Sequence, residues 1–383
     1  MTFKILSLDG GGIRGVLSAR LLQEVETTIR QTYKQELHEY FDLITGTSTG
    51  SIITAAIACQ MKAQQMIDVY LNEGENIFLN SVRQQRKWRK VSEAIGSHVL
   101  YPHEKGEQGL TKVLQKNLIH PQLGSPKISQ IDKPYILIPA YDVYSRNTTW
   151  FANNPVDDGA WYDHIELWKI CTASASAPTF FPPYELPYNE EEKLPHIDGG
   201  VSANNPGLMA IAHALLIEKK NNLKLGDIAV LSIGTGDTTR PYSYEKVKNW
   251  GLLGWANHLS DMFLNPGAQN SKVICEQILE SAGGDVLRLN FDLNDRFEGE
   301  KQPGRLRPLL DEPYNEYIYK NKKKSEKISE DIDNPENCPA LIEAAECYLD
   351  CGTVYYGQPG VPVREAIQEF INSHSVYDPP NNN

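Results

Sequence analysis

Short apolar runs alternate with longer amphipathic segments along the first part of the chain. Residues 4–8 and 41–45 are apolar runs of the length typical of buried strands. Residues 15–33 carry an apolar stripe at helical spacing, and a second helix is expected over about residues 49–59. The stripe consists of Leu17, Leu21, Val25 and Ile29. Strand, turn and helix repeated in this order predict parallel strands in an α/β sheet.

The alternation continues to about residue 236, beyond a mostly helical and polar stretch over residues 62–130. The further elements that we expect are strands over 135–139 and 228–233, a strand end and turn over 196–200, and helices over 168–177 and after Pro206. Residues 141–150 either extend the strand at 135–139 or pair with it. After about residue 240 the alternation stops, which predicts a mostly helical C-terminal extension.

The chain has 383 residues, a formal net charge of −12 and a pI of about 5.3. This acidic balance argues against a bulk attraction to nucleic acid or to an anionic membrane, so such contacts need a local basic patch. The one dense basic run is Arg83–Lys90, which contains Trp88. We interpret it either as a solvated helix face or as a peripheral membrane contact.

No secretory leader is visible, and no apolar run approaches the ~18 residues of a membrane span. We therefore expect a cytoplasmic protein, peripheral to the membrane at most. The six cysteines are scattered without the paired spacing of zinc ligands, so we expect reduced thiols and no metal. The apolar stretch over residues 250–263 predicts either core packing or a lid or interfacial anchor.

A glycine-rich turn, Asp9–Gly15, follows the first predicted strand and opens the first predicted helix. Its glycines at 10, 12 and 15 match G-x-G-x-x-G, the fingerprint of a dinucleotide site. The next strand, however, ends in Gly46-Thr47-Ser48 and lacks the acidic residue that would bind a ribose. The alternative is an oxyanion loop, whose backbone N–H groups converge on an anion near the positive end of the helix.

A second turn, Gly46-Thr47-Ser48-Thr49-Gly50, matches G-x-S-x-G. The two glycines allow a sharp turn from strand to helix that projects the serine side chain, as a nucleophile requires. The alternative is an ordinary tight turn with a capping serine. A strand before it and a small-residue helix after it favour the nucleophile.

Serine needs a proton acceptor, and Asp198-Gly199-Gly200 provides a candidate at the end of an apolar stretch. Asp198 would accept the Ser48 proton directly, although Asp-Gly is also a common turn. A full triad through His196 or His258 is the other arrangement that the sequence leaves open.

Taken in order, the three motifs Asp9–Gly15, Gly46–Gly50 and Asp198–Gly200 closely resemble the patatin-like phospholipase family. Two further segments, Ala173–Pro183 and Asn204–Pro206, are similar to that family as well. The resemblance covers about residues 4–236. It implies a three-layer α/β/α fold with a mainly parallel central sheet, as a catalytic domain over residues 4–236 with its motif core at 4–207. The mostly helical extension over residues 237–377 would pack on this core, and residues 378–383 would form a disordered tail.

The resemblance also implies a hydrolase of acyl esters in phospholipids and other lipids, without metal or organic cofactor. Ser48 matches the family nucleophile and Asp198 the acid of a two-residue dyad. Gly10, Gly11 and Gly12 match the oxyanion loop, with electrostatic support from Arg14. Two rival classes stay open, a nucleotide- or dinucleotide-binding protein and a non-catalytic protein of the same fold. The oligomeric state stays unknown.

Overall fold

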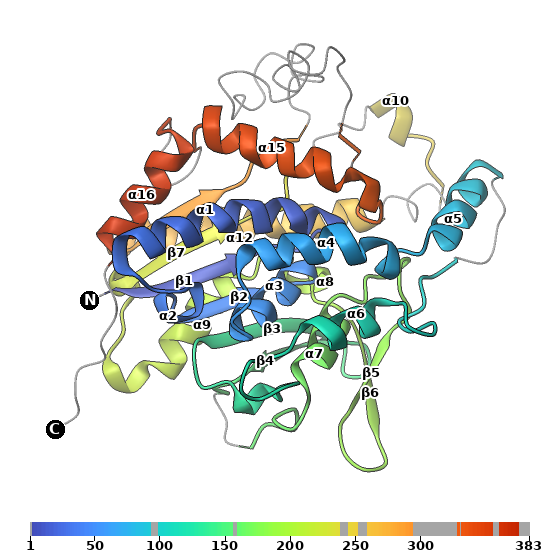
Figure 1. Ribbon diagram of the computed structural model, residues 1–383, viewed down its shortest axis with the longest axis horizontal. Coiled ribbons are helices and arrows are strands. Elements are labelled where there is room, and N and C mark those ends of the chain that lie inside the picture. The colour runs from blue at the N-terminus through green and yellow to red at the C-terminus, as the bar shows by residue number, and fades with distance from the viewer. Residues whose placement is uncertain are drawn as a thin grey trace.

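The computed structural model describes residues 2–92, 99–155, 159–237, 244–251, 259–293, 328–329, 331–354 and 360–374. Within these residues, an eight-stranded sheet lies at the centre of the molecule (Figure 1). Its strands are β1 (Phe3–Leu8), β2 (Leu43–Gly46), β3 (Tyr135–Asp142), β4 (Asn147–Ala152), β5 (Tyr184–Pro187), β6 (Lys193–Asp198), β7 (Ile228–Ile233) and β8 (Asp285–Leu289).

The order across the sheet is β5-β6-β3-β2-β1-β7-β8, and β4 pairs with β3 beside this path. β1 runs parallel to β2 and to β7, β2 parallel to β3, and β7 parallel to β8. β4 and β6 are antiparallel to β3, and β5 is antiparallel to β6. The sheet is therefore mainly parallel, with its antiparallel pairs on the β3 side.

The helices differ widely in length, and short 3-10 turns connect some of them. The α-helices are α1 (Gly15–Tyr33), α2 (Leu37–Tyr40), α3 (Thr49–Ala58), α4 (Ala63–Ile77), α5 (Asn80–Ser92), α6 (Leu110–Asn117), α7 (Leu167–Ser174), α8 (Gly200–Ala203), α9 (Gly207–Ile217), α10 (Tyr244–Val247), α12 (Leu259–Ala282), α15 (Cys338–Cys351) and α16 (Val363–Ser373). The 3-10 helices are Gly12–Arg14, Ile128–Gln130, Lys219–Asn221, Leu225–Asp227 and Pro335–Asn337.

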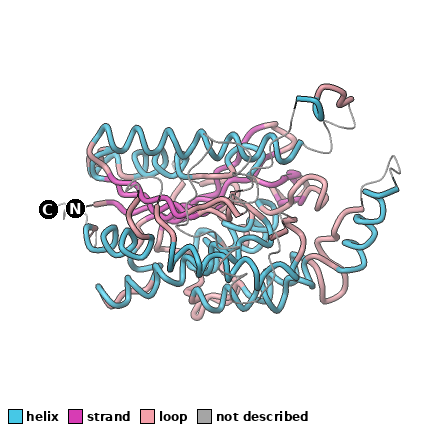
Figure 2. The backbone as a smooth tube through the Cα atoms, turned by 90° about the horizontal axis from the view of Figure 1, so that it is seen from above, coloured by secondary structure: helices cyan, strands magenta, loops and turns pink. Residues whose placement is uncertain are grey.

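Helices cover both faces of the sheet, and Figure 2 shows the strands as a band between them. Because side chains alternate along a strand, Leu6 and Leu8 face the helices α1, α3 and α4, whereas Phe3 and Ile5 face α9 and α12. α15 and α16 pack on α1 as a further cover of the first face. This arrangement confirms the predicted α/β fold with three layers and a mainly parallel sheet.

Two features of the sheet are not evident from the sequence pattern. β8 lies beyond residue 240, where the alternation of strand and helix was expected to stop, and it continues the sheet next to β7. Arg288 interrupts the apolar run of β8, and it is buried because it has an acidic partner elsewhere in the chain. The second feature is the antiparallel direction of β6, the strand that ends at Asp198.

The domain limits at residues 236 and 377 stay predictions, and the tail at 378–383 lies outside the described residues. Of the stretch over residues 250–263, residues 252–258 and the side chains of residues 259–263 are outside the description as well. No helix among the described residues has the length and apolar character needed to cross a membrane.

Candidate active site

The Ser48 turn joins strand β2 to helix α3 at the carboxyl end of the parallel strands. Ser48 has φ 55° and ψ −122°, a backbone conformation that residues with a side chain rarely adopt. A Cβ atom on Gly46 would lie 2.1 Å from the carbonyl oxygen of Gly50, and one on Gly50 would lie 2.3 Å from that of Leu8. Both positions therefore need glycine, and the sharp turn that carries Ser48 depends on them.

Asp198 is the last residue of β6, which is separated from β2 by β3 alone. Its side chain is buried, and Oδ1 accepts a hydrogen bond from the Gly200 N–H at 2.7 Å. Burial raises the pKa of Asp198 from 3.8 to about 6, and hydrogen bonding by the Ser48 side chain and the Gly200 N–H opposes this rise. The structure thus brings the predicted nucleophile and base together, 150 positions apart in the sequence.

Gly199 allows the chain to turn immediately after Asp198. A Cβ atom at this position would lie 2.2 Å from the carbonyl oxygen of Pro139 in β3. That oxygen belongs to the backbone and cannot rotate away, so a larger residue would displace the turn. Of the two glycines, Gly199 gives the close approach to β3 and Gly200 gives the N–H that binds the carboxylate.

The end of α7 lies between the nucleophile turn and Asp198. The Ser174 hydroxyl accepts a hydrogen bond from the Ser48 N–H at 3.1 Å and donates one to the Pro139 carbonyl oxygen at 2.7 Å. The carbonyl oxygen of Ser176 accepts the Asp198 N–H at 3.0 Å. One segment therefore fixes the backbone of both candidate catalytic residues. The sequence singled out this segment by resemblance alone, and its positioning role was missed.

The glycine-rich loop lies directly beside Ser48. A Cβ atom on Gly10 would lie 3.2 Å from the Ser48 Cβ and 2.3 Å from Oδ1 of Asn204. The Gly10 N–H donates to the Asn204 carbonyl oxygen at 3.0 Å, and the Gly10 carbonyl oxygen accepts the Thr235 hydroxyl at 3.0 Å. Gly10 therefore anchors the loop, and its N–H is already in use within the protein.

The N–H groups of Gly11 and Gly12 have no acceptor among the described residues. The Thr49 N–H, at the N-terminus of α3, also has none in the same part of the chain. Gly12 has φ 59°, a conformation that favours glycine. Thr49 follows the nucleophile, the position that supplies an oxyanion donor in a nucleophile elbow. The sequence analysis missed Thr49, although this rule would have identified it.

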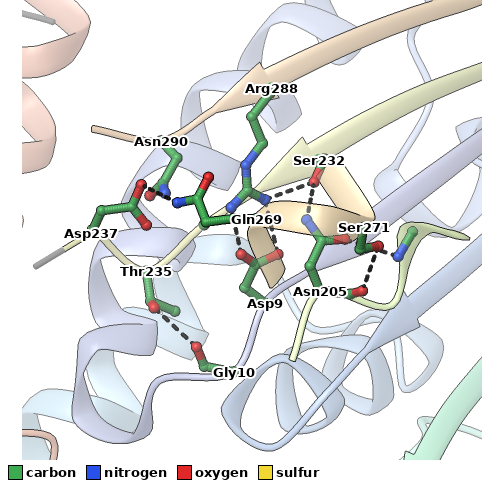
Figure 3. Close-up of polar contacts among 12 residues, drawn as sticks. Asp9, Gly10, Asn205, Ser232, Thr235, Asp237, Gln269, Ser271, Arg288 and Asn290 are labelled. Atoms are coloured by element: carbon green, nitrogen blue, oxygen red, sulfur yellow. Dashed lines mark hydrogen bonds and ion pairs between the residues drawn. The ribbon is translucent and has the colours of Figure 1, made fainter. Parts of the chain in front are cut away.

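A buried ionic cluster supports the loop from the α12 side of the sheet (Figure 3). The Arg288 guanidinium binds both carboxylate oxygens of Asp9, and it donates to the Ser232 hydroxyl at 2.7 Å. Burial raises the pKa of Asp9, and Arg288 opposes the rise. Burial and the nearby Arg288 lower the pKa of Lys272 to about 8, and Asp237 opposes that change. The cluster fixes the residue that immediately precedes the three glycines.

Arg14 lies at the other end of the loop, where helix α1 begins. It lines a polar cavity of about 20 Å³ together with Asp9, Asn204 and Arg288, which is room for about one water molecule. Its cationic side chain therefore lies beside the backbone that the sequence assigned to oxyanion binding. The electrostatic role of Arg14 stays a prediction.

Among the histidines that the structure describes, none supports a triad. His196 is buried, and its ring nitrogens lie 3.0 Å from the Leu194 carbonyl oxygen and 3.2 Å from the Thr149 hydroxyl. Burial lowers the pKa of His196. His258 lies outside the described residues. His103, which the sequence analysis did not select, lies 3.0 Å from the Ser176 hydroxyl, and burial lowers its pKa to about 4.

The basic run Arg83–Lys90 belongs to α5, and two of its arginines bind acidic residues of the chain. Arg83 is 3% exposed and pairs with Glu336 at 2.9 Å. Arg86 pairs with Asp333 at 3.4 Å. The side chains of residues 87–90 lie outside the described residues. A membrane contact of this run stays a prediction, and it would depend on those four residues.

Within the described residues, no group of three or more His, Cys, Asp or Glu side chains is arranged to hold a metal ion. All six cysteines are free thiols. The polar cavity beside the glycine loop is too small for a nucleotide, since it holds about one water molecule.

Comparison with known proteins connects this geometry to a family. The sequence model described as patatin-like phospholipase matches residues 6–211. Patatin-like protein 3 of Arabidopsis thaliana is 32% identical over an alignment of 282 positions, which covers 66% of this chain and 63% of that protein. Patatin group D-3 of Solanum tuberosum is 27% identical over an alignment of 324 positions, which covers 73% of this chain and 76% of that protein. The match thus spans less than two thirds of the Arabidopsis relative's length.

The similar proteins include one whose name denotes a loss of activity. The protein called probable inactive patatin-3-Kuras 1, of Solanum tuberosum, is 28% identical over 67% of this chain and 70% of its own length. Among solved structures, human GIVD cytosolic phospholipase A2 is similar with a TM-score of 0.42 and 11% identity, over 97% of this chain and 62% of that one. Sequence similarity alone therefore does not establish that this chain is catalytic.

Proposed function

Because the chain belongs to the patatin-like phospholipase family, we propose that it is a serine lipid acyl hydrolase acting through Ser48 and Asp198. The observation that carries the proposal is the pairing of a serine on a strained turn with a buried carboxyl whose pKa is about 6. Such a carboxyl is ionised at neutral pH and still basic enough to take a proton during catalysis. Its substrates would be phospholipids or other acyl lipids.

In the first half of the reaction, the Ser48 oxygen attacks the carbonyl carbon of the ester while Asp198 accepts the hydroxyl proton. The C–O bond to the leaving alcohol then breaks, and protonated Asp198 returns the proton to that alcohol. The product left on the enzyme is an acyl ester of Ser48. The hydrogen bond from the Gly200 N–H keeps the Asp198 carboxylate oriented through these steps.

In the second half, water attacks the acyl carbon and gives a proton to Asp198. The tetrahedral intermediate releases the fatty acid, and the proton passes back to the Ser48 oxygen. The N–H groups of Gly11, Gly12 and Thr49 are the donors that we assign to the negatively charged oxygen of both intermediates. Loss of one such donor costs about 10²–10³-fold in turnover.

Two rival functions are less well supported. A dinucleotide on the glycine loop would need open space above the glycines. A Cβ atom on Gly12 would lie 2.4 Å from the Ile332 carbonyl oxygen, and one on Gly11 would lie 2.3 Å from the Thr235 hydroxyl, so protein atoms fill the space on the Cβ side of both glycines. A non-catalytic protein would not need Ser48 and Asp198 together, and both are present, with the Ser48 side chain close enough to lower the pKa of Asp198.

The test is a titration of the purified protein with a fluorophosphonate ester, followed by phospholipid vesicles as substrate. We expect the wild type to be labelled, Ser48→Ala not to be labelled, and Asp198→Asn to be labelled far more slowly. Equal labelling of the wild type and Ser48→Ala would exclude Ser48 as the reactive group. Labelling without release of fatty acid from any vesicle would exclude lipids as the substrate class.

A further inference from the structure

Arg86, in the basic run of α5, contacts three separate segments of the protein. Its Nη1 donates hydrogen bonds to the carbonyl oxygens of Thr179 and Val99, at 2.6 and 3.0 Å. Its Nε pairs with Asp333 at 3.4 Å, and the guanidinium lies 4.4 Å from the centre of the Phe180 ring. The Arg86 side chain is 13% exposed, so water competes little for these contacts.

The contact with Thr179 leads to the residues that hold the candidate nucleophile and base. Thr179 has φ 71°, which is strained for a β-branched residue, so the loop around it benefits from an external hydrogen bond. This loop directly follows Ser174 and Ser176. The Ser174 hydroxyl oxygen accepts the Ser48 N–H, and the Ser176 carbonyl oxygen accepts the Asp198 N–H. A displaced Thr179 loop would therefore move both candidate catalytic residues.

The contact with Asp333 leads to the glycine loop. Oδ2 of Asp333 also accepts the hydroxyl of buried Tyr101 at 2.8 Å, so this carboxylate is held from two sides. The carbonyl oxygen of the preceding residue, Ile332, accepts the Ile13 N–H at 2.8 Å. The same carbonyl oxygen is the one that a Cβ atom on Gly12 would meet at 2.4 Å. The backbone at Ile332 therefore packs directly on Gly12, one of the proposed oxyanion donors.

We propose that Arg86 is a positioning residue for the proposed hydrolysis, joining the segment that holds Ser48 and Asp198 to the segment that holds the glycine loop. The role rests on the function proposed above. A planar guanidinium is suited to it because its separate N–H groups reach Thr179, Val99 and Asp333 at once. A lysine would keep the charge and lose this fixed geometry.

The test measures kcat and KM for a soluble ester, p-nitrophenyl butyrate, together with thermal unfolding, in the full chain. We expect Arg86→Gln to lower kcat by about 10- to 100-fold while KM changes by less than about twofold, because a small misplacement slows chemistry more than binding. Arg86→Lys keeps the positive charge, and Asp333→Asn removes only one of the contacts of Arg86, so both should lower kcat to an intermediate extent.

Arg83→Gln is the matched control. Arg83 lies one turn earlier on the same helix and is buried, and it pairs with Glu336 of the same C-terminal segment. We expect this variant to lower the unfolding temperature and to keep the wild-type kcat. An equal fall of kcat in Arg83→Gln and Arg86→Gln would reduce Arg86 to a structural role and overturn the proposal. If Arg86→Gln does not fold, the same comparison is made with Arg86→Lys and Asp333→Asn.

The failure of this proposal is distinguishable from failure of the proposed function. Hydrolysis that depends on Ser48 but keeps its kcat in the Arg86 and Asp333 variants would overturn the positioning role alone. A wild type without any Ser48-dependent hydrolysis or labelling would overturn the function and the positioning role with it.

Discussion

The guanidinium of Arg288 in β8 forms a bidentate ion pair with the carboxylate of Asp9, with N–O distances of 2.8 and 2.5 Å (Figure 3). Both side chains are buried, and 279 positions separate them in the sequence. Asp9 directly precedes the glycine loop. The ion pair therefore makes β8 part of the support of the candidate active site.

Arg288→Met should destabilise the fold, because it leaves the Asp9 carboxylate buried without its partner. Breaking one side of a buried pair typically costs about 3–5 kcal/mol. The double variant Asp9→Asn with Arg288→Met should recover part of this loss, since no uncompensated charge remains. Urea unfolding of the two single variants and the double variant gives the coupling energy. If the two single substitutions have strictly additive effects on the free energy of unfolding, the coupling energy between Asp9 and Arg288 is zero.

The activity should depend on the ionisation of Asp198. A base with a pKa of about 6 is protonated in acid, so kcat/KM should rise as pH increases through about 6 and level off above it. The rate of fluorophosphonate labelling should follow the same curve. Intrinsic tryptophan fluorescence at each pH serves as the control for unfolding. A labelling rate that stays constant from pH 5 to pH 8 would exclude Asp198 as the base.

The same pKa implies that ionised Asp198 destabilises the fold. The folded pKa of about 6 lies above the ordinary value of 3.8, so the native state binds more protons between these two values. The stabilising contribution is complete below about pH 3.8 and is lost as pH rises through 6. At pH 8, Asp198→Asn should therefore raise the free energy of unfolding, on the order of 1–3 kcal/mol.

Comparison with a low pH isolates this effect, because protonated Asp198 carries no such penalty. The gain in Asp198→Asn should shrink as the pH falls through 6 towards 4. Urea unfolding at pH 8 and at the lowest pH that keeps the fold measures both values. If Asp198→Asn raised the free energy of unfolding equally at both pH values, the cause would be packing of the new side chain and not loss of the carboxylate charge.

Much of the fold near the site could be predicted from local patterns. The helix expected over residues 15–33 has the bounds Gly15–Tyr33, and the strand at 228–233 is also observed. These segments pack in the core, so their apolar spacing reflects burial directly. The glycine and serine motifs lie together because they follow two adjacent parallel strands, β1 and β2, whereas Asp198 ends the antiparallel strand β6.

The remaining features depend on contacts between distant parts of the chain. β8 was missed because an arginine in a short apolar run is usually exposed, and the sequence does not show that Arg288 pairs with Asp9. Arg86 was interpreted as part of a surface patch, although it turns toward Thr179 and Asp333. In both cases a charged side chain turns away from solvent toward a partner that sequence periodicity does not reveal.

Gly10→Ala provides the most direct test of where the glycine loop acts. The added methyl group would lie 3.2 Å from the Ser48 Cβ and 2.3 Å from Oδ1 of Asn204. The contact with the Ser48 Cβ displaces the loop by a few tenths of an ångström, and the proposed donors at Gly11 and Gly12 move with it, so fluorophosphonate labelling should slow by about 10²-fold or more. The unfolding temperature should fall only modestly, because the Asn204 side chain can yield.

Gly267→Ala is the matched control for this change. Gly267 lies within α12, and a Cβ atom there meets nothing within 4 Å. Its labelling rate should equal that of the wild type, and its stability should stay the same or increase by up to about 1 kcal/mol, since alanine favours a helix over glycine. If Gly10→Ala were labelled as fast as Gly267→Ala, the glycine loop would have no part in stabilising the reaction at Ser48. The negative charge would then be stabilised from the N-terminus of α3 alone, where the Thr49 N–H is the remaining donor.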